Sequence, residues 1–115
     1  MHELSITQNI LRIATEEAER AGASRIEAIR LRIGALTGIS AESVRFYLGA
    51  LTPGTMAEGV RLDVTEVPVG ATCPSCSFFF LVEDLDLECP RCRSMAKVTQ
   101  GLELSVESLK VQQTV

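Results

Sequence analysis

Two Cys-X-X-Cys motifs, CPSC and CPRC, restrict how the second half of this 115-residue chain folds. They contain the four cysteines of the sequence, with twelve residues between the pairs: Cys73 and Cys76, then Cys89 and Cys92. Two residues between cysteines let both thiolates of one turn reach the same ion, and a hairpin of the intervening length brings the second pair to it. The spacing therefore predicts one closed tetrahedral site of four thiolates, typical of structural Zn²⁺.

Other functions use the same cysteine pattern. An Fe(Cys)₄ centre of a rubredoxin-like electron carrier needs the same ligands, and spacing alone does not distinguish the two metals. Two separate redox-active pairs are disfavoured, because a thioredoxin-like motif belongs between a strand and a helix, which this segment does not offer. A zinc-ribbon module that binds a protein or a nucleic acid is a further alternative.

The charge of the chain argues against nucleic acid as a partner. The formal net charge is −4, and the cysteine segment has four acidic side chains against three basic ones between residues 83 and 97. An acidic protein repels a polyanion, so phosphate contacts would be unfavourable.

The cysteine segment, residues 70–98, is too short to bury much apolar surface by itself. The metal must therefore supply folding free energy, on the order of 10 kcal/mol in small zinc modules. Three successive phenylalanines, Phe78, Phe79 and Phe80, are predicted to form a small core in this lobe, with at least one facing outward.

Hydrophobic periodicity divides the rest of the chain into two helices and three strands. Apolar residues recur at helical spacing over 4–22, with Gly22 as the stop, and over 41–51, with Ser40 as the N-cap. Apolar and polar residues alternate over three further stretches, 25–33, 60–69 and 102–111. In the last stretch, Leu102, Leu104 and Val106 are predicted to face inward.

These elements predict an α+β fold: a three-stranded sheet with two helices on one face, and a small zinc-ribbon-like Cys₄ lobe inserted before the last strand. The predicted domains are residues 1–69 with 99–115, and residues 70–98. The longest apolar run has five residues, and no basic region followed by a long apolar run opens the chain. Both observations predict a cytoplasmic protein without a membrane partner.

His2 is the only histidine and follows the first residue. A terminus of this kind offers the amine, the His2 amide nitrogen and the His2 ring nitrogen as a chelate. The amide of Glu3, its carboxylate or a water completes four-coordination. Nitrogen-rich square-planar surroundings favour Ni²⁺ or Cu²⁺ over Zn²⁺. The alternative is a solvent-exposed histidine without a metal role.

Several ordered motifs resemble the HypA/HybF family of hydrogenase nickel-incorporation proteins. They are MHELSI, RLRIGALTGISAESVRFYL, GTMAEGVRLDVTEVP, the two cysteine pairs and TQGLELSVESLKV, in the family's order through nearly the whole chain. The resemblance implies an α+β nickel-binding domain with an inserted zinc lobe. It also implies a nickel metallochaperone of NiFe hydrogenase maturation, and no enzyme activity.

The resemblance also assigns ligands and partners. It implies that His2 binds the Ni(II) cargo, with Glu3 beside it as a candidate ligand, and that the four cysteines hold structural Zn(II). The implied partners are a HypB-type GTPase and the hydrogenase large subunit, with urease maturation proteins for some members. The sequence leaves the oligomeric state open, a homodimer included.

Two residues depart from the family pattern. Ser77 and Arg93 follow the two cysteine motifs, where members often have glycine. The departure predicts slight strain in each turn.

Overall fold

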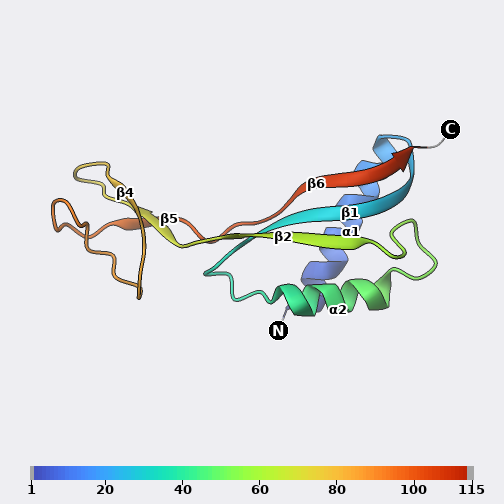
Figure 1. The fold of residues 1–115 in the computed structure, drawn as a ribbon, viewed down its shortest axis with the longest axis horizontal. Helices are drawn as coiled ribbons and strands as arrows, with labels where there is room; N and C mark the ends of the chain where they lie inside the picture. Colours follow the sequence, from blue (N-terminus) through green and yellow to red (C-terminus); the bar gives the residue numbers. More distant parts are fainter. Residues whose placement is uncertain (1, 114–115) are drawn as a thin grey trace. The chain divides into compact units, whose positions relative to one another are not determined.

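The computed structural model describes residues 2–113 (Figure 1). Its elements in chain order are α1 (Glu3–Arg20), β1 (Ala23–Gly34), α2 (Ala41–Leu51), β2 (Arg61–Val67), β3 (Gly70–Thr72), β4 (Phe79–Leu81), β5 (Lys97–Gln100) and β6 (Leu104–Gln113). The chain forms two compact units, one of residues 1–32, 39–65 and 105–115, and one of residues 33–38 and 66–104. The division into a domain of residues 1–69 and 99–115 and a lobe of residues 70–98 stays a prediction.

The predicted α+β fold is confirmed. The longer strands form a sheet of order β2-β1-β6, and α1 and α2 pack together on one face of it (Figure 1). Ile29 and Leu31 of the central strand β1 are fully buried, whereas Arg30 between them is exposed. This alternation gives the sheet one apolar face and one charged face.

The first helix begins and ends close to the predicted positions. Its buried residues are Thr7, Ile10, Ala14 and Ala18, which recur at helical spacing. The helix ends at Arg20, and Gly22 follows with a φ of +73°, a backbone conformation that favours glycine. Leu4 and Ala21 belong to the stretch 4–22 in which apolar residues recur at helical spacing, but both are exposed, because they lie at the two ends of the helix.

The second helix has the predicted N-cap. The Ser40 hydroxyl oxygen accepts a hydrogen bond from the Ser43 N–H at 3.2 Å. Val44 and Leu48 are buried, and Tyr47 and Leu51 are half-buried on the same side. The helix therefore contributes the predicted face to the core.

The start of the last strand differs from the prediction. The strand begins at Leu104, and Leu102 and Leu104 are 64% and 38% exposed, so the prediction that both face inward was wrong. A turn occupies residues 101–103, where the Gly101 N–H donates to the Glu103 carboxylate and the Leu36 N–H donates to the Gly101 carbonyl at 2.8 Å. Because this turn interrupts the extended backbone, the alternation begins later.

The cysteine segment contains a second, smaller sheet of order β4-β3-β5. Strand β3 pairs antiparallel with both neighbours, with Ala71 opposite Phe80 of β4 and opposite Val98 of β5. The Phe78 and Phe80 rings stack with centroids 6.2 Å apart, whereas Phe79 is 45% exposed. The expectation that at least one phenylalanine faces outward is confirmed.

Within residues 2–113, no helix is both long enough and apolar enough to cross a membrane.

Candidate metal centres

The two cysteine motifs fold into two turns with the same hydrogen bonds. In the first, the Ser77 N–H donates to the Cys73 carbonyl at 2.8 Å and the Cys73 N–H donates to the Phe78 carbonyl at 2.9 Å. In the second, the Arg93 N–H donates to the Cys89 carbonyl at 2.9 Å and the Cys89 N–H donates to the Ser94 carbonyl at 2.8 Å. The repeated turn aims both cysteines of each motif in one direction.

The four sulfur atoms form a single cluster. All four Sγ atoms lie within 4.8 Å of one another, and none is in a disulfide. Two of the separations join the two motifs, at 3.4 Å between Cys73 and Cys92 and 3.7 Å between Cys76 and Cys89. Zn–S bonds of about 2.3 Å place tetrahedral sulfurs about 3.8 Å apart, so the cluster fits a zinc ion. A single cluster of four sulfurs argues against two separate redox pairs.

The residue after each motif adopts a left-handed backbone conformation. Ser77 has a φ of +65° and Arg93 a φ of +68°. This conformation costs a residue with a Cβ atom roughly 1 kcal/mol relative to glycine. The positive φ that the turn requires is therefore the physical cause of the strain predicted at these two positions.

Substituting glycine at these positions is expected to stabilise the lobe. Ser77→Gly and Arg93→Gly should each raise its free energy of unfolding by about 0.5–1 kcal/mol, because glycine adopts a positive φ without strain. Chelator-induced unfolding, followed by circular dichroism, measures the change. Ser75→Gly is the matched control, since Ser75 lies in the same turn without a positive φ; equal effects at Ser75 and Ser77 would contradict this explanation.

The surroundings of the cysteine thiols shift their pKa values in different directions. The side chain and backbone N–H of Ser94, followed by the Cys73 thiol, lower the pKa of the Cys92 thiol to about 6. The Phe78 N–H acts in the same direction on Cys76, but loss of hydration and the three neighbouring thiols raise the pKa of Cys76 to about 11. Binding of a metal by four thiolates must therefore release protons, that of Cys76 among them.

Ser94 is a neighbour of the cluster that the sequence reasoning missed. It stabilises the thiolate of Cys92 from two positions further along the chain, as Phe78 does for Cys76. The sequence feature that could have pointed to Ser94 is its position two residues after the last cysteine of its motif, the same position that Phe78 has in the first motif.

His2 lies at the N-cap of α1. Its side chain is exposed and makes no capping hydrogen bond, while its carbonyl accepts the Ile6 N–H at 2.9 Å. Met1, whose amine belongs to the predicted chelate, lies outside the described residues. Within residues 2–113, His2 belongs to no cluster of three or more His, Cys, Asp or Glu side chains. Side chains alone therefore do not build a closed site at this terminus.

Glu3 connects the beginnings of the two helices. Its carboxylate oxygen Oε2 accepts a hydrogen bond from the Ser40 N–H at 3.4 Å, and its carbonyl accepts the Thr7 hydroxyl at 2.6 Å. The carboxylate thus lies beside the N-terminus of α2, where the helix dipole favours a negative charge. Ligation of a metal by Glu3 would compete with this contact.

The sequence of the whole chain matches a known family. The profile described as hydrogenase/urease nickel incorporation, metallochaperone, hypA, matches residues 1–111. The chain belongs to the HypA family. The fold and the cysteine cluster agree with the resemblance found in the sequence motifs, and the family is one of nickel metallochaperones.

Individual HypA proteins are similar over their full length. The hydrogenase maturation factor HypA of Chloroflexus aurantiacus is 42% identical over 96% of this chain and 98% of its own. The corresponding factor of Azotobacter vinelandii is 40% identical over 97% of this chain and 100% of its own. The solution structure of the Ni metallochaperone HypA from Helicobacter pylori has a TM-score of 0.72 and 25% identity, and covers 99% of this chain and 100% of its own.

Proposed function

We propose that this HypA-family chain binds Ni(II) at its N-terminus and delivers it during maturation of NiFe hydrogenase. The family membership supports a role in nickel incorporation. The observation that carries the proposed site is the exposed imidazole of His2, which no capping hydrogen bond occupies. A delivery protein needs such an exposed and incomplete site, because a closed site would retain its cargo.

The start of α1 supplies further nickel ligands. The first N–H groups of a helix have no intrahelical acceptor, so the backbone nitrogens of His2 and Glu3 are not committed to the helix. Together with the amine of Met1 and the His2 ring, these nitrogens suit the square-planar preference of Ni²⁺. Glu3 contributes its backbone nitrogen or, after release from Ser40, its carboxylate.

The position of the site favours release of nickel as well as binding. The positive end of the α1 dipole disfavours a cation by about 0.3–1 kcal/mol, and Glu3 in the first turn partly offsets this effect. These two opposing effects favour weak, reversible binding of nickel at this site.

The cysteine cluster has a different role in this proposal. When bound, zinc supplies folding free energy to the lobe, held by Cys73, Cys76, Cys89 and Cys92. Four thiolates leave no open coordination position for a substrate. The protein is accordingly a metal carrier and not an enzyme.

The proposed partners follow from the family's role. They are a HypB-type GTPase, the hydrogenase large subunit that receives nickel and, where urease is matured, urease maturation proteins. We place the protein in the cytoplasm, where reduced cysteines persist as metal ligands.

Removing the His2 side chain is expected to abolish stoichiometric nickel binding and leave the fold intact. His2→Ala removes an exposed group without a capping bond, so the free energy of unfolding should change by less than about 0.5 kcal/mol. Nickel titration of untagged protein and thermal unfolding measure the two effects. Gln8→Ala, an exposed substitution on the same helix, is the control. Unchanged nickel binding in His2→Ala would reject the site, and a large loss of stability would assign His2 a structural role.

A further inference from the structure

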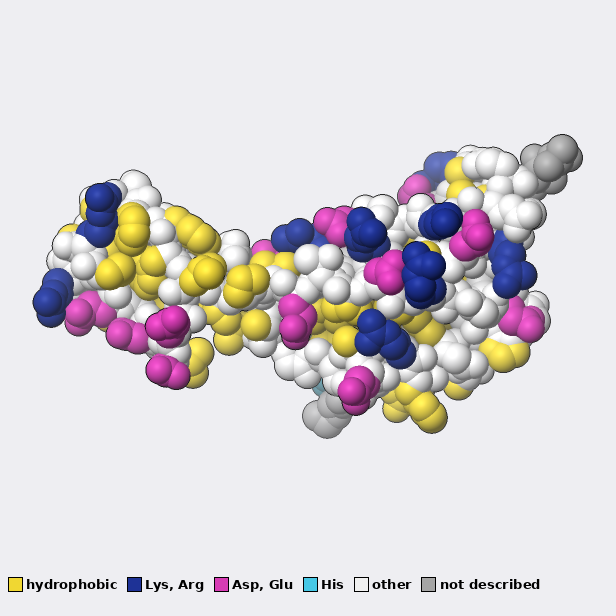
Figure 2. Space-filling model, viewed as in Figure 1, with side chains coloured by type: hydrophobic (Ala, Val, Ile, Leu, Met, Phe, Trp, Pro, Cys, Tyr) yellow, Lys and Arg dark blue, Asp and Glu magenta, His cyan; other side chains and the backbone are white. Residues whose placement is uncertain are grey.

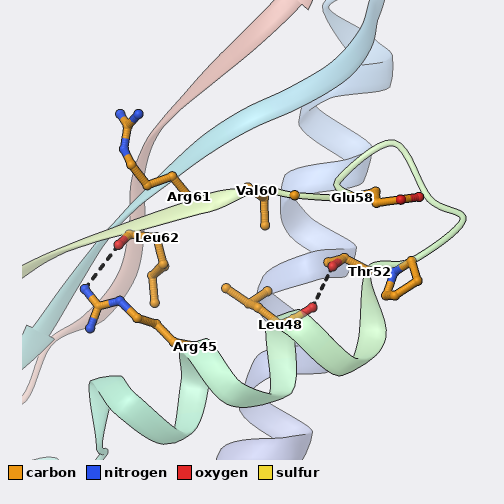
Figure 3. A pocket seen from close by; sticks show the side chains of 10 residues that line it. Arg45, Leu48, Thr52, Glu58, Val60, Arg61 and Leu62 are labelled. Carbon is orange, nitrogen blue, oxygen red and sulfur yellow. Dashed lines mark hydrogen bonds between the residues drawn. The ribbon is translucent and has the colours of Figure 1, made fainter.

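Hydrophobic side chains are visible between α2 and β2, an edge strand of the larger sheet (Figure 2). A groove of about 500 Å³ lies here, lined by α2, the loop after it and the start of β2 (Figure 3). Leu48 and Leu62 of its lining are buried, and Val60 is half-buried. The Thr52 hydroxyl, also in the lining, donates to the Leu48 carbonyl at 2.7 Å and is therefore occupied. The groove thus presents mainly apolar surface to a ligand.

Gly49 of α2 keeps this groove open. It lies in the lining, and its φ is not positive, so the backbone conformation does not require glycine. A Cβ atom built there would meet no other side chain or segment within 4 Å, so packing does not require glycine either. A glycine inside a helix costs about 0.5–1 kcal/mol relative to alanine. Helix α2 is therefore less stable than it could be, at a position where a side chain would fill the groove.

Arg45 carries a positive charge beside the groove. Its guanidinium donates to the Leu62 carbonyl at 3.1 Å (Figure 3). Within residues 2–113, Arg45 forms no ion pair. A guanidinium has five N–H donors in a planar fork, so this bond leaves donors for a carboxylate. Glu58, an acidic residue of the lining, already accepts the Gly54 N–H at 2.8 Å.

The surroundings of Asp63 on β2 have an excess of positive charge. Asp63 forms an ion pair with Arg61 of the groove lining at 3.1 Å. The hydrogen bond from Arg61, followed by the charges of Arg61, Arg30 and Arg45, lowers the pKa of the Asp63 carboxyl. Three arginines therefore act on one carboxylate, although the net charge of the chain is −4. Such a local excess of positive charge favours a partner that brings a further carboxylate.

We propose that this groove binds a short segment of a partner protein in which a large apolar side chain stands next to an acidic one. The apolar side chain enters the space beside Gly49, against Leu48 and Val60, and the neighbouring carboxylate pairs with Arg45. Burial of the apolar side chain supplies affinity, and the charge-assisted hydrogen bond to the planar guanidinium supplies selectivity for an acidic segment.

The groove and the nickel site proposed above lie near different ends of α2. Glu3, next to His2, accepts a hydrogen bond from the Ser40 N–H before the first turn of α2, whereas the groove surrounds Gly49. At a rise of 1.5 Å per residue, Ser40 and Gly49 are about 13 Å apart along the helix. A segment bound in the groove therefore leaves His2 exposed, and its binding does not depend on the nickel site.

Three capped tetrapeptides test the recognition on isotope-labelled, zinc-loaded protein. Acetyl-Ala-Leu-Asp-Ala-amide is expected to bind with a Kd on the order of 1 mM and to shift the NMR signals of Gly49 and Val60. Replacing its leucine by alanine should weaken binding by about tenfold, because less apolar surface is buried. Replacing its aspartate by asparagine should weaken binding by about threefold, because the charge opposite Arg45 is lost.

Two variants of the protein test the groove itself. Gly49→Leu fills the space and should abolish saturable peptide binding, while the melting temperature stays the same or rises, since leucine favours a helix more than glycine does. Arg45→Gln should bind the aspartate and asparagine peptides equally. Ala50→Leu is the matched control, because Ala50 is exposed, follows Gly49 in α2 and does not line the groove; it should bind like the wild type.

Nickel titration of Gly49→Leu and peptide titration of His2→Ala distinguish the groove from the nickel site, since each variant should lose only its own ligand. Peptide binding that survives in Gly49→Leu, or that is lost equally in Ala50→Leu, would overturn the proposal. So would the absence of saturable binding to the wild type, or equal affinity of the wild type for the aspartate and asparagine peptides. Groove signals that shift with protein concentration alone would assign the groove to a second copy of the chain and would also overturn it.

Discussion

Replacing Cys73 by serine is expected to release the metal and unfold the cysteine lobe, while α1 and α2 remain folded. Cys73 is fully buried, and its sulfur lies 3.4 Å from that of Cys92 in the opposite turn. Three remaining thiols do not complete the tetrahedral ligand set. The lobe then loses much of a metal contribution on the order of 10 kcal/mol, which exceeds what its small apolar core can supply.

Hydrogen exchange and metal analysis measure this loss. Amides over about residues 70–98 should lose protection in Cys73→Ser, whereas the amides of α1 serve as the internal reference. Ser75→Ala is the control, because Ser75 lies exposed in the same turn and is not a predicted ligand. Retention of one zinc ion and full protection in Cys73→Ser would refute the shared four-thiolate site.

The same protein sample identifies the metal. Zn(Cys)₄ does not absorb visible light, whereas the Fe(Cys)₄ centre of a rubredoxin-like carrier is coloured. A colourless protein with one equivalent of zinc is expected. A coloured protein with iron in the cluster would instead support an electron carrier.

A long polypeptide fused to the amino group of Met1 is expected to abolish nickel transfer even though His2 is present. The extension removes the terminal amine from the proposed chelate. The exposed imidazole at the start of α1 remains, but the nitrogen-rich set that favours Ni²⁺ is incomplete. Hydrogenase activation and nickel affinity, measured on untagged and extended protein, report the loss.

Adding a single residue before Met1 is expected to change nickel affinity and nickel delivery in opposite directions. The terminus then reads X-Met-His, in which the amine, two amides and the imidazole complete a square plane around Ni²⁺. Affinity should rise while hydrogenase activation falls, because no position remains open for exchange with a partner. Equal affinity and equal activation in the untagged, one-residue and long-extension proteins would show that the amine and amides are not ligands.

Features that depend on neighbouring residues were predictable from the sequence alone. The apolar spacing of α1, the Ser40 cap of α2 and the grouping of Cys-X-X-Cys pairs involve interactions within a few residues. Strain at Ser77 and Arg93 was predictable for the same reason, since it arises within a single turn. His2 stands out because it is the only imidazole, although its binding of nickel stays a proposal.

Only the tertiary structure decided the contacts between distant segments. The two cysteine motifs meet across the lobe, where the sulfurs of Cys73 and Cys92 lie 3.4 Å apart, and Glu3 contacts the N-terminus of α2. Shortly before β6, the chain passes so close to Gly34 that an added Cβ there would lie 2.2 Å from the Gly101 backbone, so this crossing of distant segments requires glycine. Such contacts depend on strand order and register, which are set by the free energy of the whole core. A local pattern of residues therefore does not determine strand order or register.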